Sequence, residues 1–205
     1  MITLPIRTDA TAPIVRGARQ GEWTYAAWEL LGADEYRYEI IDGALYMTTA
    51  PSSFHQWIVM QLLRLYGVPA LERKLGFAYI APIGVIMPGC DPVQPDFVFV
   101  RAANAGIIRD KRIFGVPDMI AEVMSPGSAA YDTVVKKEAY QAAGVPEYAV
   151  IDPGARQVSL YTLTPDRAYG DPAVLRESDL IRFAALPAIE SPVGALYAGS
   201  PDTTL

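Results

Sequence analysis

The sequence QPDFVFV at residues 94–100 reads as a turn followed by a buried strand, and it begins with a carboxylate. A second apolar segment, MIAEVM at residues 119–124, carries another carboxylate near its middle. Asp96 and Glu122 thus belong to segments whose other side chains favour burial. A buried carboxylate is costly unless a positive group compensates it. A divalent cation could satisfy both acids at once, which makes a metal-dependent phosphodiester hydrolase our first hypothesis.

Each acid also has a purely structural explanation. Asp96 could cap a turn at the edge of its strand, as an isolated Pro-Asp pair often does. Glu122 is harder to explain in this way, because apolar side chains occupy both faces of its strand. A strand that is apolar on both faces is buried on both. We therefore expect Glu122 to enter the interior or to line a cleft.

Lys136 is the third candidate and lies in a helix expected over residues 132–143, which Gly144 ends. At about 100° per residue, Lys136 falls at the edge of the buried face of this helix. Asp132 lies one turn earlier and could form an i, i+4 pair with it, worth only about 0.3–0.5 kcal/mol on a surface. If the ammonium instead reaches the cleft, it could position or deprotonate a water and offset negative charge. Tyr140 could hold that ammonium or fill the core.

Composition narrows the class of protein. A chain of 205 residues, of which 51% are hydrophobic, suits one globular domain. Its formal net charge of −6 argues against a broad basic face that coats nucleic acid, although a local basic rim is compatible with it. The single cysteine, Cys90, excludes an intramolecular disulfide and a cysteine-based zinc site. Without a signal-like start or a membrane-length apolar run, the sequence predicts a cytoplasmic protein with no membrane partner.

The order of the predicted elements indicates an α/β (α+β) domain around one mixed, mostly antiparallel sheet flanked by helices. We expect a flexible arm at residues 1–21, a single domain at 22–190 and an irregular tail at 191–205. Asp-Gly at residues 42–43, between two strand-like runs, predicts a hairpin. Helices are expected at 24–31, 52–66 and 132–143, and strands at 36–41, 45–48, 77–87, 97–100, 119–124, 147–151, 158–163 and 181–184. Pro69 limits the second helix, although a further helical stretch to Lys74 is compatible with the sequence, and residues 88–92 read as a turn.

Taken together, these segments resemble the Uma-two family, bacterial domains of the PD-(D/E)XK restriction-endonuclease-like superfamily. The resemblance covers roughly residues 24–190 and is specific only as a series. Its parts are YEIIDG at 38–43, His55, QPD at 94–96, PDMIAEVMSP at 117–126, YD at 131–132 with Lys136 and Tyr140, GVPEY at 144–148 and IDP at 151–153.

The resemblance implies a restriction-endonuclease-like core in which Asp96 and Glu122 bind Mg²⁺ or Mn²⁺, ions that favour such hard oxygen ligands. The sequence departs from the superfamily motif at Met124, where a lysine is expected two residues after the glutamate. A thioether cannot replace an ammonium. The family pattern places the lysine on the following helix, which points to Lys136.

Further residues are candidates with open alternatives. Glu39 could supply another carboxylate or face solvent from its strand. His55, the one histidine, could cap a helix, donate to a phosphate or carry a proton. Gln94 could orient a water or be a polar strand edge. The basic residues Arg109, Lys111 and Arg112 could contact substrate phosphate or belong to a solvated loop.

Three functions remain open from the sequence. The first is an endonuclease that acts on DNA, with a homodimer expected because cutting two strands takes two sites. The second is a catalytically inactive module of the same fold with a regulatory or assembly role, which the acidic balance and Met124 favour. The third is a hydrolase of small phosphodiesters or nucleotides, which would need few basic residues.

Overall fold

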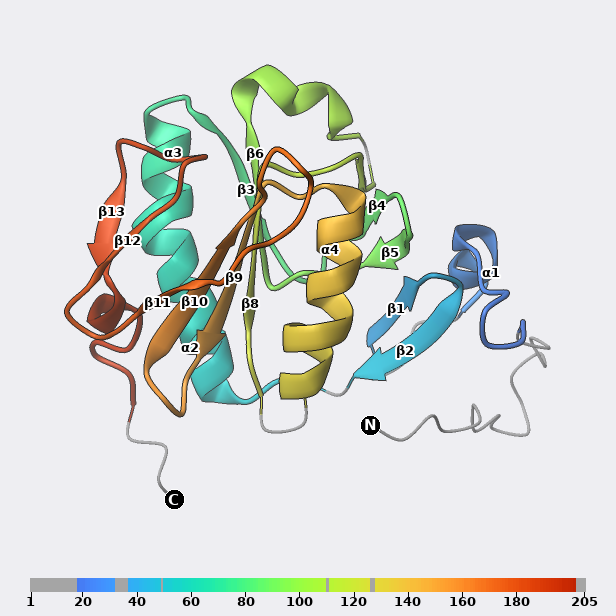
Figure 1. Cartoon of the computed structure of the whole chain (residues 1–205), viewed down its shortest axis with the longest axis horizontal. Helices are drawn as coiled ribbons and strands as arrows, with labels where there is room; N and C mark the ends of the chain where they lie inside the picture. Colours follow the sequence, from blue (N-terminus) through green and yellow to red (C-terminus); the bar gives the residue numbers. More distant parts are fainter. Residues whose placement is uncertain (1–17, 32–36, 49, 110, 126–127, 202–205) are drawn as a thin grey trace.

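The computed structural model describes residues 18–31, 37–48, 50–109, 111–125 and 128–201. A central sheet holds six strands in the order β11-β10-β9-β8-β6-β3 (Figure 1). Within the described residues its neighbouring strands are antiparallel except for β8 and β9. The strands are β3 Gly76–Ile80, β6 Phe97–Arg101, β8 Met119–Val123, β9 Glu147–Asp152, β10 Gln157–Thr162 and β11 Ala173–Leu175. The mixed, mostly antiparallel sheet expected from the sequence is confirmed.

A second sheet, of order β2-β1-β5-β4-β7, lies beside the first. Its strands are β1 Arg37–Ile41, β2 Ala44–Thr48, β4 Val85–Met87, β5 Cys90–Val93 and β7 Ile113–Phe114. The predicted hairpin is present: Asp42 and Gly43 have φ of 48° and 71°, as a two-residue primed turn requires. The short helix α1 Tyr25–Glu29 begins where Thr24 accepts a hydrogen bond from the Ala27 N–H.

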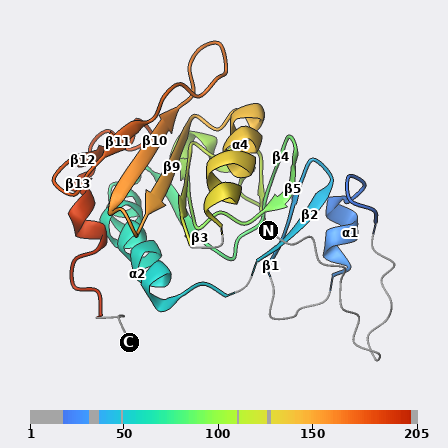
Figure 2. The same ribbon diagram turned by 60° about the horizontal axis from the view of Figure 1, so that its bottom comes forward.

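Two composite helices cover opposite faces of the central sheet (Figures 1 and 2). The first runs through α2 Ser53–Leu62, the π-helical η1 Leu63–Gly67 and α3 Val68–Glu72. Pro69 does not end this helix, because it occupies the first turn of α3, where the missing N–H is tolerated. The second consists of the π-helical η3 Tyr131–Lys136 followed by α4 Lys137–Ala143. It ends at Gly144 with φ 92°, as predicted.

The strands of the central sheet separate two hydrophobic cores. Phe97 and Phe99 of β6 face the core under α2 and α3, whereas Val98 and Val100 face the core under α4. The strand β8 alternates in the same way, and its Ile120 faces α4. Because side chains two residues apart share a face, Glu122 also enters the interior on the α4 side.

Two sequence predictions about local structure are wrong. Residues 88–92 are not a simple turn, because Cys90 begins strand β5 and is fully buried; burial raises the pKa of its thiol to about 12. The single strand expected at 77–87 is two strands, β3 and β4, that belong to different sheets. Pro82 and Gly84 in the intervening residues interrupt the pairing, so the chain can cross from one sheet to the other.

The ends of the predicted domain also need correction. The tail expected from residue 191 is packed on the core, with Val193, Leu196 and Tyr197 all buried. It contains β13 Glu190–Pro192, which pairs with β12 Leu180–Arg182, and the 3-10 helix η4 Val193–Leu196. Most of the expected N-terminal arm lies outside the described residues, although the Gly21 N–H donates to the Gly43 carbonyl. No helix among the described residues is long and apolar enough to cross a membrane.

Candidate active site

The ends of two neighbouring strands bring Asp96 and Glu122 together. Asp96 directly precedes β6, and Phe97 of β6 pairs with Ala121 of β8. The Asp96 backbone N–H donates to Glu122 Oε2 at 3.3 Å. The two side chains are 5% and 2% exposed. The structure thus brings the two residues together from two segments that are separate in sequence.

Lys136 reaches both strands from the helix. Its Nζ lies 2.9 Å from Glu122 Oε1, 3.3 Å from Glu39 Oε2 and 3.9 Å from Asp132 Oδ1. The side chain is buried, not at the edge of the helix as a uniform α-helical period predicts. The difference arises because Lys136 ends the π-helical η3, whose i→i+5 bonding changes which side chains share a face.

Glu39 faces the interior from strand β1 and is 1% exposed, so it does not face solvent. Its Oε1 accepts a hydrogen bond from the Gln94 N–H at 2.6 Å, and its Oε2 accepts one from the Tyr131 hydroxyl at 3.0 Å. The side-chain amide of Gln94 donates to the Tyr38 carbonyl at 3.0 Å. Gln94 therefore fixes Glu39 through its backbone, and its side chain is committed to the hairpin.

His55 is held against Asp96 at the start of helix α2. The Ser52 hydroxyl oxygen accepts a hydrogen bond from the His55 N–H, so Ser52 is the N-cap. The ring Nε2 lies 3.0 Å from Asp96 Oδ2, which also accepts the Val123 N–H at 3.0 Å. Among the described residues, the buried His55 Nδ1 has no hydrogen-bond partner. His55 can orient Asp96 and still offer one ring nitrogen.

Sequence reasoning missed or undervalued three partners of these groups. The Arg37 guanidinium lies 3.4 Å from Asp96 Oδ1. The hydroxyls of Tyr131 and Tyr140 donate to Glu39 and to Glu122 Oε1 respectively, the latter at 2.8 Å. Tyr140 therefore fills the core and also fixes a carboxylate. No local signal identifies Arg37, because its partner is 59 positions away in sequence.

The cluster contains more carboxylates than nearby cations. Glu39, Glu122 and Asp132 contact Lys136, whereas Asp96 contacts Arg37 and His55. Among the described residues, Lys136 and Arg37 are the two Lys or Arg side chains paired with these four carboxylates. Burial, together with the neighbouring carboxylates, raises the pKa of Glu122 well above its usual value, with Lys136 opposing the shift. Burial raises the pKa of Asp132 to about 6 in the same way.

The pKa values of Asp96 and Lys136 shift in the directions that favour the charged forms of both side chains. Burial acts to raise the pKa of Asp96, but the hydrogen bond and charge of His55, with Lys136 nearby, bring the pKa down to about 2. Burial acts to lower the pKa of Lys136, but the surrounding carboxylates outweigh it and raise that pKa. Lys136 is therefore a charged ammonium at neutral pH, which suits offsetting and positioning charge better than removing a proton.

The carboxylates present the hard oxygen donors that Mg²⁺ or Mn²⁺ takes. In the part of the chain that the structure describes, no group of three or more His, Cys, Asp or Glu side chains is arranged to hold a metal ion. Mg²⁺ is commonly held by one or two carboxylates and keeps water or substrate phosphate as its other ligands. The surplus of buried carboxylates over cations also favours uptake of positive charge. The donor set of Asp96 and Glu122 thus fits such an ion.

The three basic residues predicted to touch substrate make no hydrogen bond or ion pair to the carboxylates within the described residues. The guanidinium of Arg109 lies over the Phe114 ring at 5.6 Å and that of Arg112 over the Trp28 ring at 5.0 Å. Lys111 is exposed.

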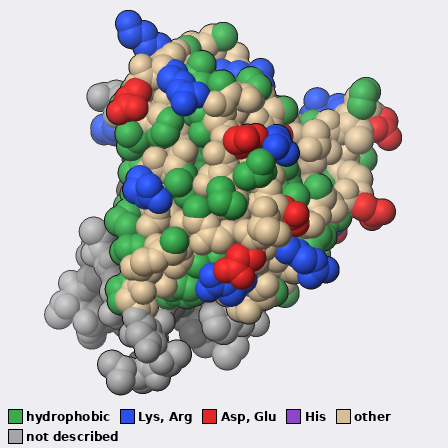
Figure 3. Space-filling model, turned by 90° about the vertical axis from the view of Figure 1, so that its left-hand side faces the viewer, with side chains coloured by type: hydrophobic (Ala, Val, Ile, Leu, Met, Phe, Trp, Pro, Cys, Tyr) green, Lys and Arg blue, Asp and Glu red, His purple; other side chains and the backbone are tan. Residues whose placement is uncertain are grey.

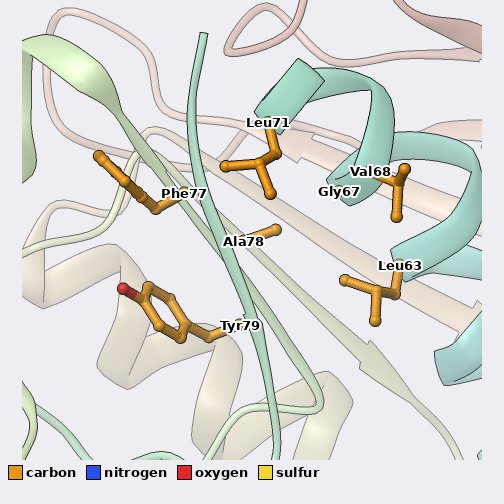
Figure 4. A pocket seen from close by; sticks show the side chains of 7 residues that line it. All are labelled: Leu63, Gly67, Val68, Leu71, Phe77, Ala78 and Tyr79. Carbon is orange, nitrogen blue, oxygen red and sulfur yellow. The ribbon is translucent and has the colours of Figure 1, made fainter. Parts of the chain in front are cut away.

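An apolar hollow of about 190 Å³ lies elsewhere on the molecule. Helix residues line one side of it and strand β3 the other, with Ala78 pointing toward the helix and Phe77 and Tyr79 pointing away (Figure 4). Its lining is Leu63, Gly67, Val68, Leu71, Phe77, Ala78 and Tyr79. None of these side chains is ionised at neutral pH, so the hollow does not add to the chemistry of the carboxylates.

Comparisons with known proteins agree with this architecture. Residues 24–194 match the model of the Uma2 family, described as "Putative restriction endonuclease". A solved structure, reported as a putative nuclease belonging to DUF820 from Anabaena variabilis ATCC 29413, superposes with a TM-score of 0.72 at 15% identity. The match covers 85% of this chain and 97% of that one. No curated protein matches. Because the family model spans most of the sequence, the chain belongs to the Uma2 family of restriction-endonuclease-like proteins and has a nuclease fold.

Proposed function

We propose that this protein is a metal-dependent phosphodiester hydrolase that acts on DNA as an endonuclease. One observation carries the proposal: Asp96 and Glu122 meet at adjoining strand ends, with the ammonium of Lys136 2.9 Å from Glu122. Two hard-oxygen acids beside a fixed cation form an arrangement suited to phosphodiester hydrolysis. Membership of a nuclease-like family supports the same reaction class.

Each side chain has a distinct role in this proposal. Asp96 and Glu122 hold Mg²⁺ or Mn²⁺, which when bound polarises a phosphate and lowers the pKa of a water. Lys136, charged at neutral pH, offsets negative charge on the phosphate and positions the attacking water. Glu39 orients the ammonium of Lys136, and His55 orients the carboxylate of Asp96.

Plasmid cleavage tests the proposal. Supercoiled DNA is incubated with Mg²⁺ or Mn²⁺ and with wild type, Glu122→Gln or Glu147→Gln. Glu147 is a matched control, because it is also a buried glutamate but binds two backbone N–H groups away from the site. We expect wild type and Glu147→Gln to nick the plasmid and Glu122→Gln to lose at least 100-fold in rate. Intact plasmid and intact single strands with purified wild type, across salt and pH, would refute the proposal.

One observation favours a non-catalytic module as the second candidate. Every carboxylate of the cluster already has a cation or hydrogen-bond donor, and none is more than 5% exposed. Calorimetry with Mg²⁺ and Mn²⁺ separates the two candidates. Saturable binding that Asp96→Asn abolishes supports the enzyme, whereas absence of binding supports the module.

Substrate size and assembly complete the proposal. Assays with nucleotides and a nitrophenyl phosphodiester distinguish a small-substrate hydrolase, which the low basic content of the chain would suit. If the protein hydrolyses these compounds but leaves DNA intact, its activity is that of a small-phosphodiester hydrolase and not that of an endonuclease. We propose a homodimer for cutting both strands, and light scattering on the purified protein tests it directly.

A further inference from the structure

A cluster of stacked arginine and aromatic side chains lies outside the carboxylate site. Tyr25 and Trp28 of α1 stack at 6.0 Å, and Tyr25 meets Phe114 of β7 edge-on at 6.2 Å. The guanidinium of Arg112 covers Trp28 and that of Arg109 covers Phe114. We call these five residues the arginine–aromatic cluster. It joins two segments that are about 80 positions apart in sequence.

Stacking prepares the two guanidinium groups for an external ligand. An aromatic face holds a guanidinium by cation–π attraction and restricts its rotation, while the N–H edge of the plane can still donate. Arg109 and the neighbouring Lys111 are exposed. Among the described residues, no carboxylate forms an ion pair with Arg109, Lys111 or Arg112, whereas the exposed Arg156 and Arg182 are paired. Within the described residues, none of the three cations is therefore neutralised by an ion pair, and Arg112 Nη1 donates to the Lys111 carbonyl at 2.7 Å.

The charge of this segment contrasts with that of the whole chain. Residues 109–112 hold three cations and one carboxylate, Asp110, in a protein of formal net charge −6. On the face shown in Figure 3, Lys and Arg side chains are interspersed with Asp and Glu side chains instead of forming a basic field. A phosphate-bearing ligand would therefore meet a local attraction here.

The cluster adjoins the carboxylate site through one backbone carbonyl. The Trp28 indole N–H donates to the Tyr38 carbonyl at 2.9 Å, and the Gln94 side chain donates to the same oxygen at 3.0 Å. Tyr38 directly precedes Glu39, whose carboxylate accepts the Gln94 N–H. A ligand lying on the cluster would thus lie beside the hairpin that carries Glu39.

We infer that Arg109, Lys111 and Arg112 bind the phosphate backbone of a single nucleic-acid strand and direct it toward the carboxylate site. The inference rests on the proposed function for the identity of the ligand, and it names where that ligand is held. Two guanidinium groups on aromatic rings, with the exposed Lys111 between them in sequence, match a short stretch of backbone, because proteins that bind single strands combine basic side chains with aromatic ones. A long duplex would require a broad basic face. This cluster does not provide one.

Fluorescence anisotropy with a labelled 20-nucleotide strand, in EDTA to prevent cleavage, tests the inference. The test variant is Arg109→Glu/Lys111→Glu, which reverses two exposed cations. The matched control is Lys74→Glu/Arg176→Glu, which makes the same change in net charge at exposed positions outside the cluster. We expect the test variant to bind at least tenfold more weakly and the control to stay within about twofold of wild type. The wild-type slope of log affinity against log salt should be about −2, from about −0.7 for each of three phosphates.

A spectroscopic measurement adds an independent readout. Because the Arg112 guanidinium covers the Trp28 ring, phosphate bound to Arg112 should change tryptophan emission in wild type and not in Trp28→Phe. Circular dichroism checks that every variant is folded. Equal weakening in the test and control variants, no binding by wild type, or stronger binding to duplex than to single strand would each overturn the inference.

The outcomes distinguish the site from the activity. Binding that depends on the cluster, without any cleavage by wild type, would sustain the inference and refute the endonuclease. Cleavage by wild type that the Arg109→Glu/Lys111→Glu variant retains at subsaturating DNA, with unchanged anisotropy, would sustain the endonuclease and refute the cluster as a binding site.

Discussion

Two buried glutamates on adjacent strands of this molecule have opposite surroundings. Glu147 of β9 is 3% exposed and accepts the N–H groups of Ala184 and Ala185, each at 2.7 Å. Glu122 of β8 is 2% exposed and shares a single ammonium with other carboxylates. The first is matched by dedicated donors and ties the C-terminal segment to the sheet. The second also accepts the Tyr140 hydroxyl and the Asp96 N–H, but it shares its cation with Glu39 and Asp132. Burial alone therefore does not identify a functional acid.

Among the changes considered, removing the ammonium of Lys136 should have the largest effect on the unfolding free energy. Lys136→Met would leave the clustered carboxylates without their central cation, and losing one partner of a buried ion pair costs about 3–5 kcal/mol. We expect that loss in the free energy of urea unfolding at pH 7. Lys137→Met is the matched control: Lys137 lies over the Tyr161 ring and should change stability by less than about 1 kcal/mol. A loss below 1 kcal/mol for Lys136→Met would show that the carboxylates do not depend on it.

Substituting Glu122 should separate activity from stability. Glu122→Gln keeps the shape of the side chain but turns one acceptor into an amide that opposes a donor, because Oε1 accepts from Lys136 and Tyr140 and Oε2 from the Asp96 N–H. We expect the unfolding free energy to fall by about 1–3 kcal/mol, while plasmid nicking, measured where the variant remains folded, falls at least 100-fold, or about 2.7 kcal/mol in activation free energy. Chemical denaturation and cleavage kinetics on one preparation measure both. Retained nicking would remove Glu122 from the reaction.

The same substitution at Glu147 should lower stability and leave plasmid nicking unchanged. Glu147→Gln turns one acceptor into an amide that opposes the N–H of Ala184 or Ala185, at a cost of about 1–3 kcal/mol. We expect a lower melting temperature with unchanged nicking at a temperature where the variant remains folded. Thermal unfolding followed by circular dichroism provides the first measurement. A stability equal to wild type would mean that Glu147 does not tie the C-terminal segment.

The smallest expected effect is the change in unfolding free energy that protonation of Asp132 causes as the pH is lowered. Burial raises the pKa of Asp132 to about 6, above its unfolded value near 3.8, so the folded state takes up this proton first. Stability linked to this group therefore rises as pH falls from about 7 to about 4, by about 1–3 kcal/mol. We expect the difference in unfolding free energy between wild type and Asp132→Asn to vary across that window and to be flat above pH 7.

The pKa shift of Asp96 has the opposite sign to that of Asp132, and it sets the lowest pH at which that experiment can be interpreted. The pKa of its carboxyl is lowered to about 2, so its stabilising contribution is present above about pH 4 and is lost as pH falls through 2. Titrations of wild type and Asp132→Asn from pH 8 to pH 4 stay above the point where that loss becomes large. A difference between the two proteins that does not change with pH would contradict the elevated pKa of Asp132.

The sequence predicts much of this fold because its signals are local. Asp42-Gly43 specifies a hairpin turn, Gly144 ends a helix, and alternation within β8 places Glu122 inside. The meeting of Asp96 and Glu122 follows once their strands pair. The short strand β13, in a segment rich in Pro and Gly, has too few residues for a period-2 pattern to be recognised, so its burial was missed.

The rest of the candidate site depends on contacts that sequence spacing does not encode. The hydrogen bond between Glu39 and Tyr131 joins residues 92 positions apart. The sequence allows Lys136 either to pair with Asp132 at the edge of the buried face or to reach the cleft. The structure buries it, because the expected α-helical period does not hold through a π-helical segment. The placement of Arg109 and Arg112 on aromatic rings similarly depends on tertiary packing between α1 and the residues around β7.

The wide turn at residues 131–136 gives the molecule an unusual point of sensitivity. A π-helical turn accommodates one residue more than the surrounding α-helix. Losing a single codon there would restore ordinary winding and rotate Tyr131 and Asp132 by about 100° relative to Lys136. Asp96 and Glu122 would be untouched, yet their neighbours would point elsewhere. Loss of activity in a member of this lineage could therefore leave every acid intact and be visible only as a one-residue gap.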